Sequence, residues 1–327
     1  MNGRVNGGVN SGVNGGVSDP VPGDVQIVEV GPRDGLQNEA VVLPTTVKVE
    51  LIRRALAAGV RRIEAVSFVH PRLVPQMADA EDVMAAVREP SFLAGVADPD
   101  AVSFIGLVLN PRGFDRAVAA GVDEVNVVVS ASEGFARRNQ NASRAELLAA
   151  AADLAERARA AGLAASVVIT TCFGCPFDGE VAPAQVLDTV RALVEAGYRE
   201  IAIADTIGVG VPAQVTDLVA GMRSIDDRLR VRAHFHNTRN TGYANAIAAV
   251  QAGVHVLDAS IGGVGGCPFA PNATGNIATE DLQYLLQRSG FRTGLDLGGL
   301  AETGLWIGEA LGRPTPALLG HAGGFPR

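Results

Sequence analysis

Two histidines lie two positions apart in a short apolar run, with Phe235 between His234 and His236. Side chains at positions i and i+2 of a β-strand project to the same side, so both imidazoles could reach one ion. The pair could equally be two hydrogen-bonded polar residues that line a core. The spacing therefore leaves a metal site and a structural pair as open interpretations.

Oxygen donors follow other apolar runs. Asp34 comes shortly after the run 25–30, and Asn276 lies beyond the run 255–260. With the two histidines they would supply two nitrogen and two oxygen donors and leave positions open for substrate or water. A mixed donor set of this kind suits Mg²⁺, Mn²⁺ or Zn²⁺.

Lysine is almost absent. Of 27 basic residues only Lys48 is a lysine, and it falls in the predicted opening turn of a helix with no glycine-rich loop around it. Schiff-base and pyridoxal-phosphate mechanisms require a lysine nucleophile. Carbanion chemistry here would therefore depend on another electron sink, for which a metal ion is the candidate.

The three cysteines have different surroundings. Cys172 and Cys175 form a CxxC without a second half-site or a thioredoxin-like context, which favours a structural turn. Cys267 ends the glycine-rich run 262–266, whose flexibility could bring the thiol to a site; a buried, inert thiol is the alternative. An odd number of cysteines in a long chain indicates a reducing, cytoplasmic compartment.

Short apolar runs alternate with helical patterns from residue 25 onward. Strands are predicted at 25–30, 62–67, 103–109, 123–130, 165–171, 199–204, 230–235 and 255–260. Helices between them include 142–161, 184–196, 213–223 and 241–252, several ending at a glycine. Eight βα units predict an α/β fold of the (β/α)₈ TIM-barrel type, with a doubly wound sheet as the rival. In such a barrel the polar residues at the strand ends would gather on one face.

The chain divides into two parts. Residues 1–22 repeat Val-Asn-Gly-Gly with small variations, which predicts a disordered tail, and residues 23–327 form one catalytic domain with extra C-terminal helices at 277–289 and 297–311. The net charge of −8 argues against nucleic acid and anionic membranes as partners. No apolar run has the roughly 18 residues that a membrane helix requires.

Several motifs resemble hydroxymethylglutaryl-CoA lyases, which belong to a wider group of metal-dependent lyases and Claisen synthases. The resemblance covers about residues 25–311 and is carried by residues 28–39, 67–69, 74–77, 205–210, 265–270 and 275–282. The stretch 36–39 (LQNE) and the Cys267 loop favour the lyases over the synthases.

The resemblance implies roles for matching positions. Asp34, His234, His236 and Asn276 would bind the divalent metal, usually Mg²⁺ or Mn²⁺. Arg33 would stabilise an enolate oxygen and Cys267 would transfer a proton, while the hydroxyl proton would go to Asp34 or His234. The supporting residues would be Glu29, Gln37, Glu64 and Asp205. A homodimer is the expected assembly.

The implied activity is retro-Claisen cleavage of 3-hydroxy-3-methylglutaryl-CoA to acetoacetate and acetyl-CoA. One departure concerns specificity: where the family usually has His-Asp-Thr-Tyr-Gly, this chain has Asn237 and Arg239 in the segment 236–242. Arg239 could contact a different acyl group or a neighbouring acid. The alternatives are the same chemistry on another 3-hydroxyacyl-CoA such as citramalyl-CoA, a Claisen-type synthase that joins an acyl-CoA to an oxo acid, and an inactive barrel that only binds.

Overall fold

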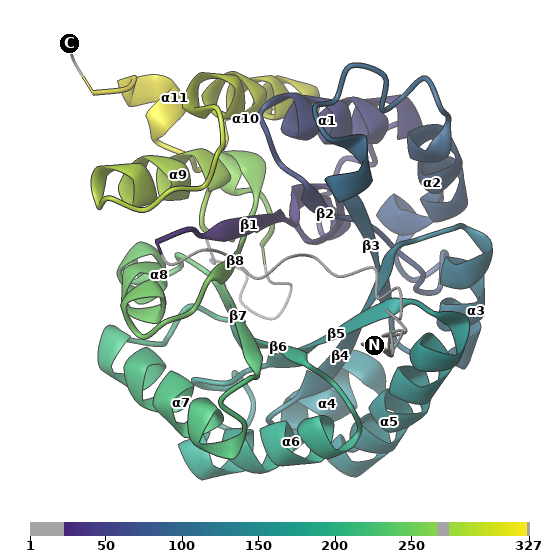
Figure 1. Ribbon diagram of the computed structural model, residues 1–327, viewed down its shortest axis with the longest axis vertical. Coiled ribbons are helices and arrows are strands. Elements are labelled where there is room, and N and C mark those ends of the chain that lie inside the picture. Colours follow the sequence, from purple (N-terminus) through teal and green to yellow (C-terminus); the bar gives the residue numbers. More distant parts are fainter. Residues whose placement is uncertain (1–22, 267–274, 326–327) are drawn as a thin grey trace, which may run out of the picture.

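The computed structural model describes residues 23–266 and 275–325. In this part of the chain eight parallel strands close into a barrel in sequence order (Figure 1). The strands are β1 (Gln26–Glu29), β2 (Arg62–Ser67), β3 (Ser103–Val108), β4 (Glu124–Ser130), β5 (Ala164–Thr170), β6 (Glu200–Asp205), β7 (Arg230–Phe235) and β8 (Val256–Ala259). Because β1 pairs with both β2 and β8, the predicted TIM barrel is confirmed and the doubly wound sheet is wrong. The predicted tail at 1–22 lies outside the described residues.

Helices form the outer ring (Figure 1). They are α1 (Thr45–Ala57), α2 (Ala80–Arg88), α3 (Pro111–Ala119), α4 (Glu133–Gln140), α5 (Arg144–Ala161), α6 (Pro183–Glu195), α7 (Pro212–Ile225), α8 (Gly242–Gln251), α9 (Thr279–Arg288), α10 (Leu297–Leu311) and α11 (Leu319–Ala322). The last three lie between α8 and α1, next to the start of the barrel. None of the helices in the described segments is long and apolar enough to cross a membrane.

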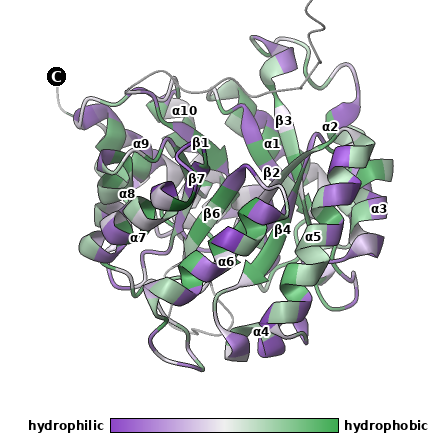
Figure 2. Ribbon diagram, turned by 60° about the horizontal axis from the view of Figure 1, so that its bottom comes forward, coloured by the Kyte–Doolittle hydropathy of each residue, from purple (hydrophilic) through white to green (hydrophobic). Residues whose placement is uncertain are grey.

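The strands are buried on both faces, which explains their nearly continuous apolar sequences. Figure 2 shows hydrophobic residues along the strands and hydrophilic residues on the outer parts of the helices. The glycines predicted to end helices have left-handed backbones, for example φ 98° at Gly59 and 104° at Gly197. Such angles are readily adopted only by glycine, so these positions let the chain turn from helix to next strand.

The described barrel interior includes an apolar cluster and a buried charged layer at opposite ends. Toward the carboxyl ends of the strands, Leu107, Val128, Val168, Ala202 and Ala204 pack together. At the opposite end lies a buried charged layer, in which Nη2 of Arg62 is 2.7 Å from Oε1 of Glu124 and 2.6 Å from Oε1 of Glu200. All three charged residues are at or near the first position of their strands. The charged layer therefore fills the end of the barrel opposite the polar strand ends.

Candidate metal centre

Three predicted ligands converge at the carboxyl ends of β1 and β7. One donor atom each from Asp34, His234 and His236 lie within 4.8 Å of one another. Asp34 is in the turn Gly31–Gly35 after β1, His234 is in β7, and His236 directly follows that strand. Nε2 of His234 is 3.8 Å from Oδ2 of Asp34. This group has the size and donor types of a divalent-metal site.

Asn276 completes the cluster. It forms an isolated bridge with His236, and its Nδ2 donates to Oδ2 of Asp34 at 2.9 Å and to the carbonyl of Val264 at 3.2 Å. These bonds orient the amide and leave Oδ1 buried without a hydrogen-bond partner in the described part of the chain. Nδ1 of His236 is in the same situation. Buried polar atoms without partners are rare, and a metal ion would explain Oδ1 of Asn276.

The electrostatics favour an ionised carboxylate beside a neutral imidazole. Burial alone would raise the pKa of Asp34, but Arg33 and the two histidines outweigh it and hold that pKa far below its ordinary value. Burial, with the neighbouring His234, lowers the pKa of His236 to about 4. Burial also disfavours the charged form of His234, yet Asp258 and Asp34 raise its pKa. Asp34 and His236 are therefore in the protonation states that bind metals.

Arg33 is fixed beside the cluster. Its Nη1 donates to Oδ1 of Asp34 at 2.7 Å, and its Nε and Nη2 donate to Oε2 of Glu64 at 2.9 and 2.5 Å. The other oxygen of Glu64 accepts from Nδ2 of Asn126 at 2.9 Å. These bonds explain why a carboxylate lies inside the apolar strand β2, because Glu64 orients Arg33.

The carboxylates of Glu29 and Asp205 accept hydrogen bonds from backbone N–H groups of nearby loops. Glu29 accepts from the backbone N–H of Gly31 and Ile261 and from the hydroxyl of Thr279. A Cβ on Gly31 would lie 2.5 Å from Oε1 of Glu29, so this close approach requires glycine. Burial raises the pKa of Glu29 to about 7. The Asp205 carboxylate accepts from two N–H groups of the loop after β6, at residues 209 and 210.

Arg33, Asp34, His234 and His236 line a cavity of about 840 Å³, whereas Asn276 lines a smaller one of about 240 Å³. The wall of the large cavity inside the barrel includes Leu107, Val128 and Val168, and another part of the lining follows residues 138–142, from the last residues of α4 into the segment before α5. Gln37 also lines it, and Oε1 of this side chain is buried without a hydrogen-bond partner among the described residues. The cavity combines an apolar wall with a polar end, as binding sites for acyl groups require.

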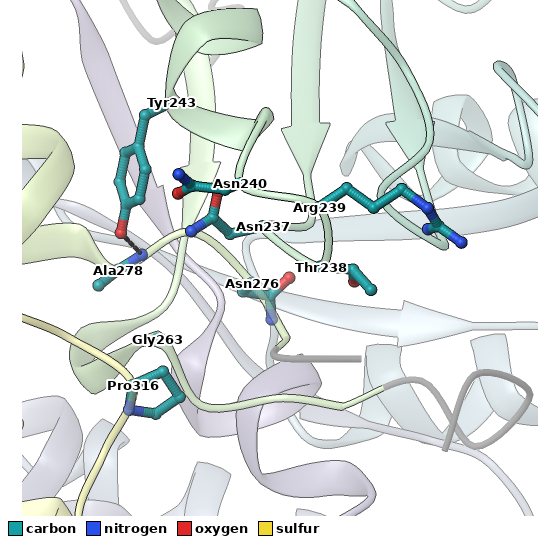
Figure 3. Close-up of a pocket in the computed structure, with 9 residues that line it drawn as sticks. All are labelled: Asn237, Thr238, Arg239, Asn240, Tyr243, Gly263, Asn276, Ala278 and Pro316. Carbon is teal, nitrogen blue, oxygen red and sulfur yellow. Dashed lines mark hydrogen bonds between the residues drawn. The ribbon is translucent and has the colours of Figure 1, made fainter. Parts of the chain in front are cut away.

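Arg239 does not line the large cavity, and its guanidinium contacts the loop after β6. Its Nη1 donates to the carbonyls of Ile207 and Gly208 at 2.9 and 3.1 Å, in the loop after β6. It lines a second, smaller cavity of about 240 Å³, drawn in Figure 3. In that view its guanidinium points away from Asn240 and Tyr243, and the hydroxyl of Tyr243 accepts from the N–H of Ala278. Asn237 also lines this cavity, and its Oδ1 accepts from the N–H of Gly242.

The CxxC is a buried turn. Cys172 and Cys175 are free thiols, and Sγ of Cys175 accepts from the hydroxyl of Ser132 at 2.8 Å. Burial raises the pKa of Cys172 to about 12, which makes it an unreactive thiol. Cys267, the predicted proton-transferring residue, lies outside the described residues.

Two residues near the cluster were missed by the sequence prediction. Asp258 of β8 places Oδ2 at 3.2 Å from Nδ1 of His234, and Arg232 of β7 places Nε at 3.1 Å from Oδ1 of Asp258. A signal was present, because each is a charged residue inside an apolar strand, as Glu64 is.

Comparisons with known proteins identify the family of the chain. Residues 24–307 match the model of the HMGL-like family. The chain is 49% identical to (R)-citramalyl-CoA lyase of Chloroflexus aurantiacus, across 91% of this chain and 95% of that protein. It is 41% identical to mitochondrial hydroxymethylglutaryl-CoA lyase of Mus musculus, across 92% and 90%.

Solved structures agree as well. The HMG-CoA lyase of Bacillus subtilis aligns with a TM-score of 0.85 at 38% identity, covering 91% of this chain and 97% of that one. An HMG-CoA lyase of Acinetobacter baumannii, solved with coenzyme A and 3-methylmalate, gives a TM-score of 0.85 at 35% identity, covering 95% and 100%. The chain therefore belongs to the HMGL-like family.

Proposed function

We propose that this protein is a divalent-metal-dependent acyl-CoA lyase that cleaves a carbon–carbon bond of a 3-hydroxyacyl-CoA by a retro-Claisen reaction. The observation that carries the proposal is the convergence of Asp34, His234 and His236 on the cavity that Arg33 also lines, with Asn276 bonded to Asp34 and its Oδ1 left without a hydrogen-bond partner among the described residues. Family membership gives the reaction class independent support.

Citramalyl-CoA is our first candidate substrate, and 3-hydroxy-3-methylglutaryl-CoA is the second. Both carry a methyl group and a hydroxyl on the carbon that is released as a ketone, and their acyl chains differ by one methylene. The motifs favour the second compound, but the chain is 49% identical to a relative named for the first and 41% to the mouse enzyme named for the second. The coenzyme A bound to the A. baumannii relative supports a thioester substrate.

A divalent cation held by Asp34, His234, His236 and Asn276 would act as a Lewis acid and template for the hydroxyl and carboxylate oxygens of the substrate. Arg33 uses three of its five N–H groups on Glu64 and Asp34, which leaves two for the thioester oxygen. Its permanent charge would stabilise the negative charge that develops there.

The proton transfers follow from the bond that breaks. The hydroxyl loses its proton to the carboxylate of Asp34, whose Oδ2 lies 3.8 Å from Nε2 of His234 at the cavity. The carbinol carbon becomes the carbonyl of an oxo acid, and the electron pair of the broken bond passes to the thioester as an enolate. The thiol of Cys267 then protonates the enolate carbon and acetyl-CoA is released.

The test is an assay of the metal-stripped full chain with each thioester, with added Mg²⁺ or Mn²⁺ and with EDTA. We expect metal-dependent pyruvate release from citramalyl-CoA with a kcat/KM about 10-fold or more above that for 3-hydroxy-3-methylglutaryl-CoA, because one methylene in a pocket is worth about 10–200-fold. The reverse order would move the substrate to the second candidate. No cleavage of either thioester by metal-loaded protein would contradict the proposed lyase.

A further inference from the structure

Asp258 lies directly beneath the metal cluster, inside the barrel. His234 and Asp258 are register partners on β7 and β8, and the carboxylate is 3% exposed. Its Oδ2 is 3.2 Å from Nδ1 of His234, while Nε2 of the same ring lies on the side of Asp34. The two nitrogens of His234 therefore have different partners.

A buried cation lies at ion-pair distance from the other oxygen of Asp258, although neither Nε of Arg232 nor Oδ1 of Asp258 makes a hydrogen bond within the described residues. Nε of Arg232 is 3.1 Å from Oδ1, and Nη1 of Arg232 is 3.4 Å from Oε1 of Glu200. Arg232 is 1% exposed and also lines the floor of the large cavity. Through Glu200 it connects to Arg62 in the charged layer. Asp258 is thus flanked by the guanidinium of Arg232 on one side and by Nδ1 of the His234 imidazole on the other.

We propose that Asp258 is a positioning residue that fixes His234 as the Nδ1–H tautomer with Nε2 directed to the metal centre, and that Arg232 keeps Asp258 in place. An ionised carboxylate can only accept a hydrogen bond, so the contact requires a proton on Nδ1. The lone pair of Nε2 is then free on the side of Asp34. Carboxylates behind metal-binding histidines orient the ring and raise its basicity.

The two histidines are held differently. Nδ1 of His236 is buried and has no hydrogen-bond partner among the described residues, whereas Nδ1 of His234 has Asp258. Loss of Asp258 should therefore weaken the metal site through one ligand alone. This inference rests on the metal site of the proposed function.

Metal affinity distinguishes positioning from mere stability. Mn²⁺ binding to the metal-stripped full chain is measured by titration calorimetry for the wild type, Asp258→Asn and Asp79→Asn. Asp79 provides the matched control, because it makes an ion pair with buried Lys48 at 2.6 Å and is absent from the metal cluster. We expect Asp258→Asn to weaken Mn²⁺ binding about 10–100-fold, the usual effect of losing such a partner, and Asp79→Asn to leave it within about twofold.

The outcomes separate this inference from the proposed function. If wild-type protein binds Mn²⁺ and the Asp258→Asn variant binds it with equal affinity, the inference alone is overturned. The same holds if Asp258→Asn and Asp79→Asn lose Mn²⁺ affinity to the same extent. Wild-type protein that binds no divalent metal overturns the metal site and the inference together.

A second measurement does not depend on the variants folding. Wild-type protein labelled with ¹⁵N-histidine and loaded with Mg²⁺ has only five histidines to assign. We expect its His234 ring to carry a proton on Nδ1 and none on Nε2. A proton on Nε2 in the metal-loaded protein would overturn the proposal.

Discussion

Arg33 and Glu64 form a buried, two-bond ion pair in which Nε and Nη2 both donate to Oε2, at 2.9 and 2.5 Å. The pair joins the turn after β1 to β2, and Nη1 of Arg33 donates to Asp34, the proposed metal ligand. Because the guanidinium is planar, this pairing fixes both its position and the direction of its free N–H groups. The geometry presents a preformed cation to the cavity.

Replacing Arg33 by lysine tests whether its guanidinium stabilises the negative charge on the thioester oxygen. Lysine keeps the charge but cannot reproduce the fork, so we expect kcat to fall about 10²–10³-fold, as for loss of an oxyanion donor. Arg53→Lys is the control, because Arg53 makes a similar two-bond pair with Glu50 on the surface. A kcat within twofold of wild type in Arg33→Lys would remove Arg33 from charge stabilisation.

Loss of a ligand should remove metal and activity together. In His236→Ala the site loses a neutral imidazole, and we expect metal content, measured by elemental analysis, and turnover to fall in parallel. His255→Ala should retain both, since His255 contacts the carbonyl of Asp24 and is absent from the metal cluster. A His236→Ala protein that keeps metal and turnover would contradict the ligand assignment.

Cys267→Ser should separate metal binding from catalysis. A hydroxyl is a much weaker acid than a thiol, so we expect turnover to fall by about 10²–10⁴-fold, the range for general acid–base groups. Metal content should stay unchanged. Cys172→Ser provides the comparison, because the Cys172 thiol is buried and donates a hydrogen bond to the carbonyl of Ile169. Equal turnover in the two variants would exclude the proposed proton transfer.

The stability of the fold should depend on the proton of Glu280. Burial raises the pKa of this carboxyl to about 8, against about 4.3 in an unfolded chain. Between these values the folded chain holds a proton that the unfolded chain has released, so this contribution to the free energy of unfolding falls as pH rises from about 4.3 to about 8.

We therefore expect Glu280→Gln to lose less stability than the wild type between pH 5 and pH 8 in urea-unfolding measurements. The amide stays neutral throughout this window, and Glu302→Gln, on the exposed face of α10, should follow the wild-type trend. Parallel pH dependence of wild type and Glu280→Gln would show that Glu280 does not hold its proton in the folded state.

Arg239→Ala should affect the fold and leave substrate preference unchanged. The two carbonyls that Arg239 contacts belong to the loop after β6, so we expect a loss of about 1 kcal/mol in the free energy of unfolding. The ratio of kcat/KM for citramalyl-CoA and 3-hydroxy-3-methylglutaryl-CoA should stay within about twofold of wild type. A tenfold change in that ratio would show that Arg239 contributes to substrate specificity.

Most of the fold could be predicted because strand and helix patterns are local. The predicted run 62–67 coincides with β2, and the helix predicted at 297–311 coincides with α10. The candidate ligands could be predicted for the same reason: His234 lies in β7 and His236 directly follows that strand, and the barrel rule brings Asp34 to the same end.

Contacts between distant segments could not be predicted in this way. Asp258 touches His234 because β7 and β8 pair in one particular register, and a shift of one residue would turn its side chain outward. Arg239 is similar, since its partners lie about 30 residues earlier in the loop after β6. Both contacts depend on how the barrel closes, which local patterns do not determine.

The charged layer at the amino-terminal ends of the strands has a consequence for folding. Arg62 of β2 pairs with Glu124 of β4 and with Glu200 of β6, so its charge is balanced by strands from both halves of the chain. A four-stranded intermediate built from β1–β4 would keep the ion pair between Arg62 and Glu124 but would lack the one between Arg62 and Glu200, which forms only when both halves of the barrel meet. The layer thus favours cooperative assembly of the whole barrel over stepwise joining of two half-barrels.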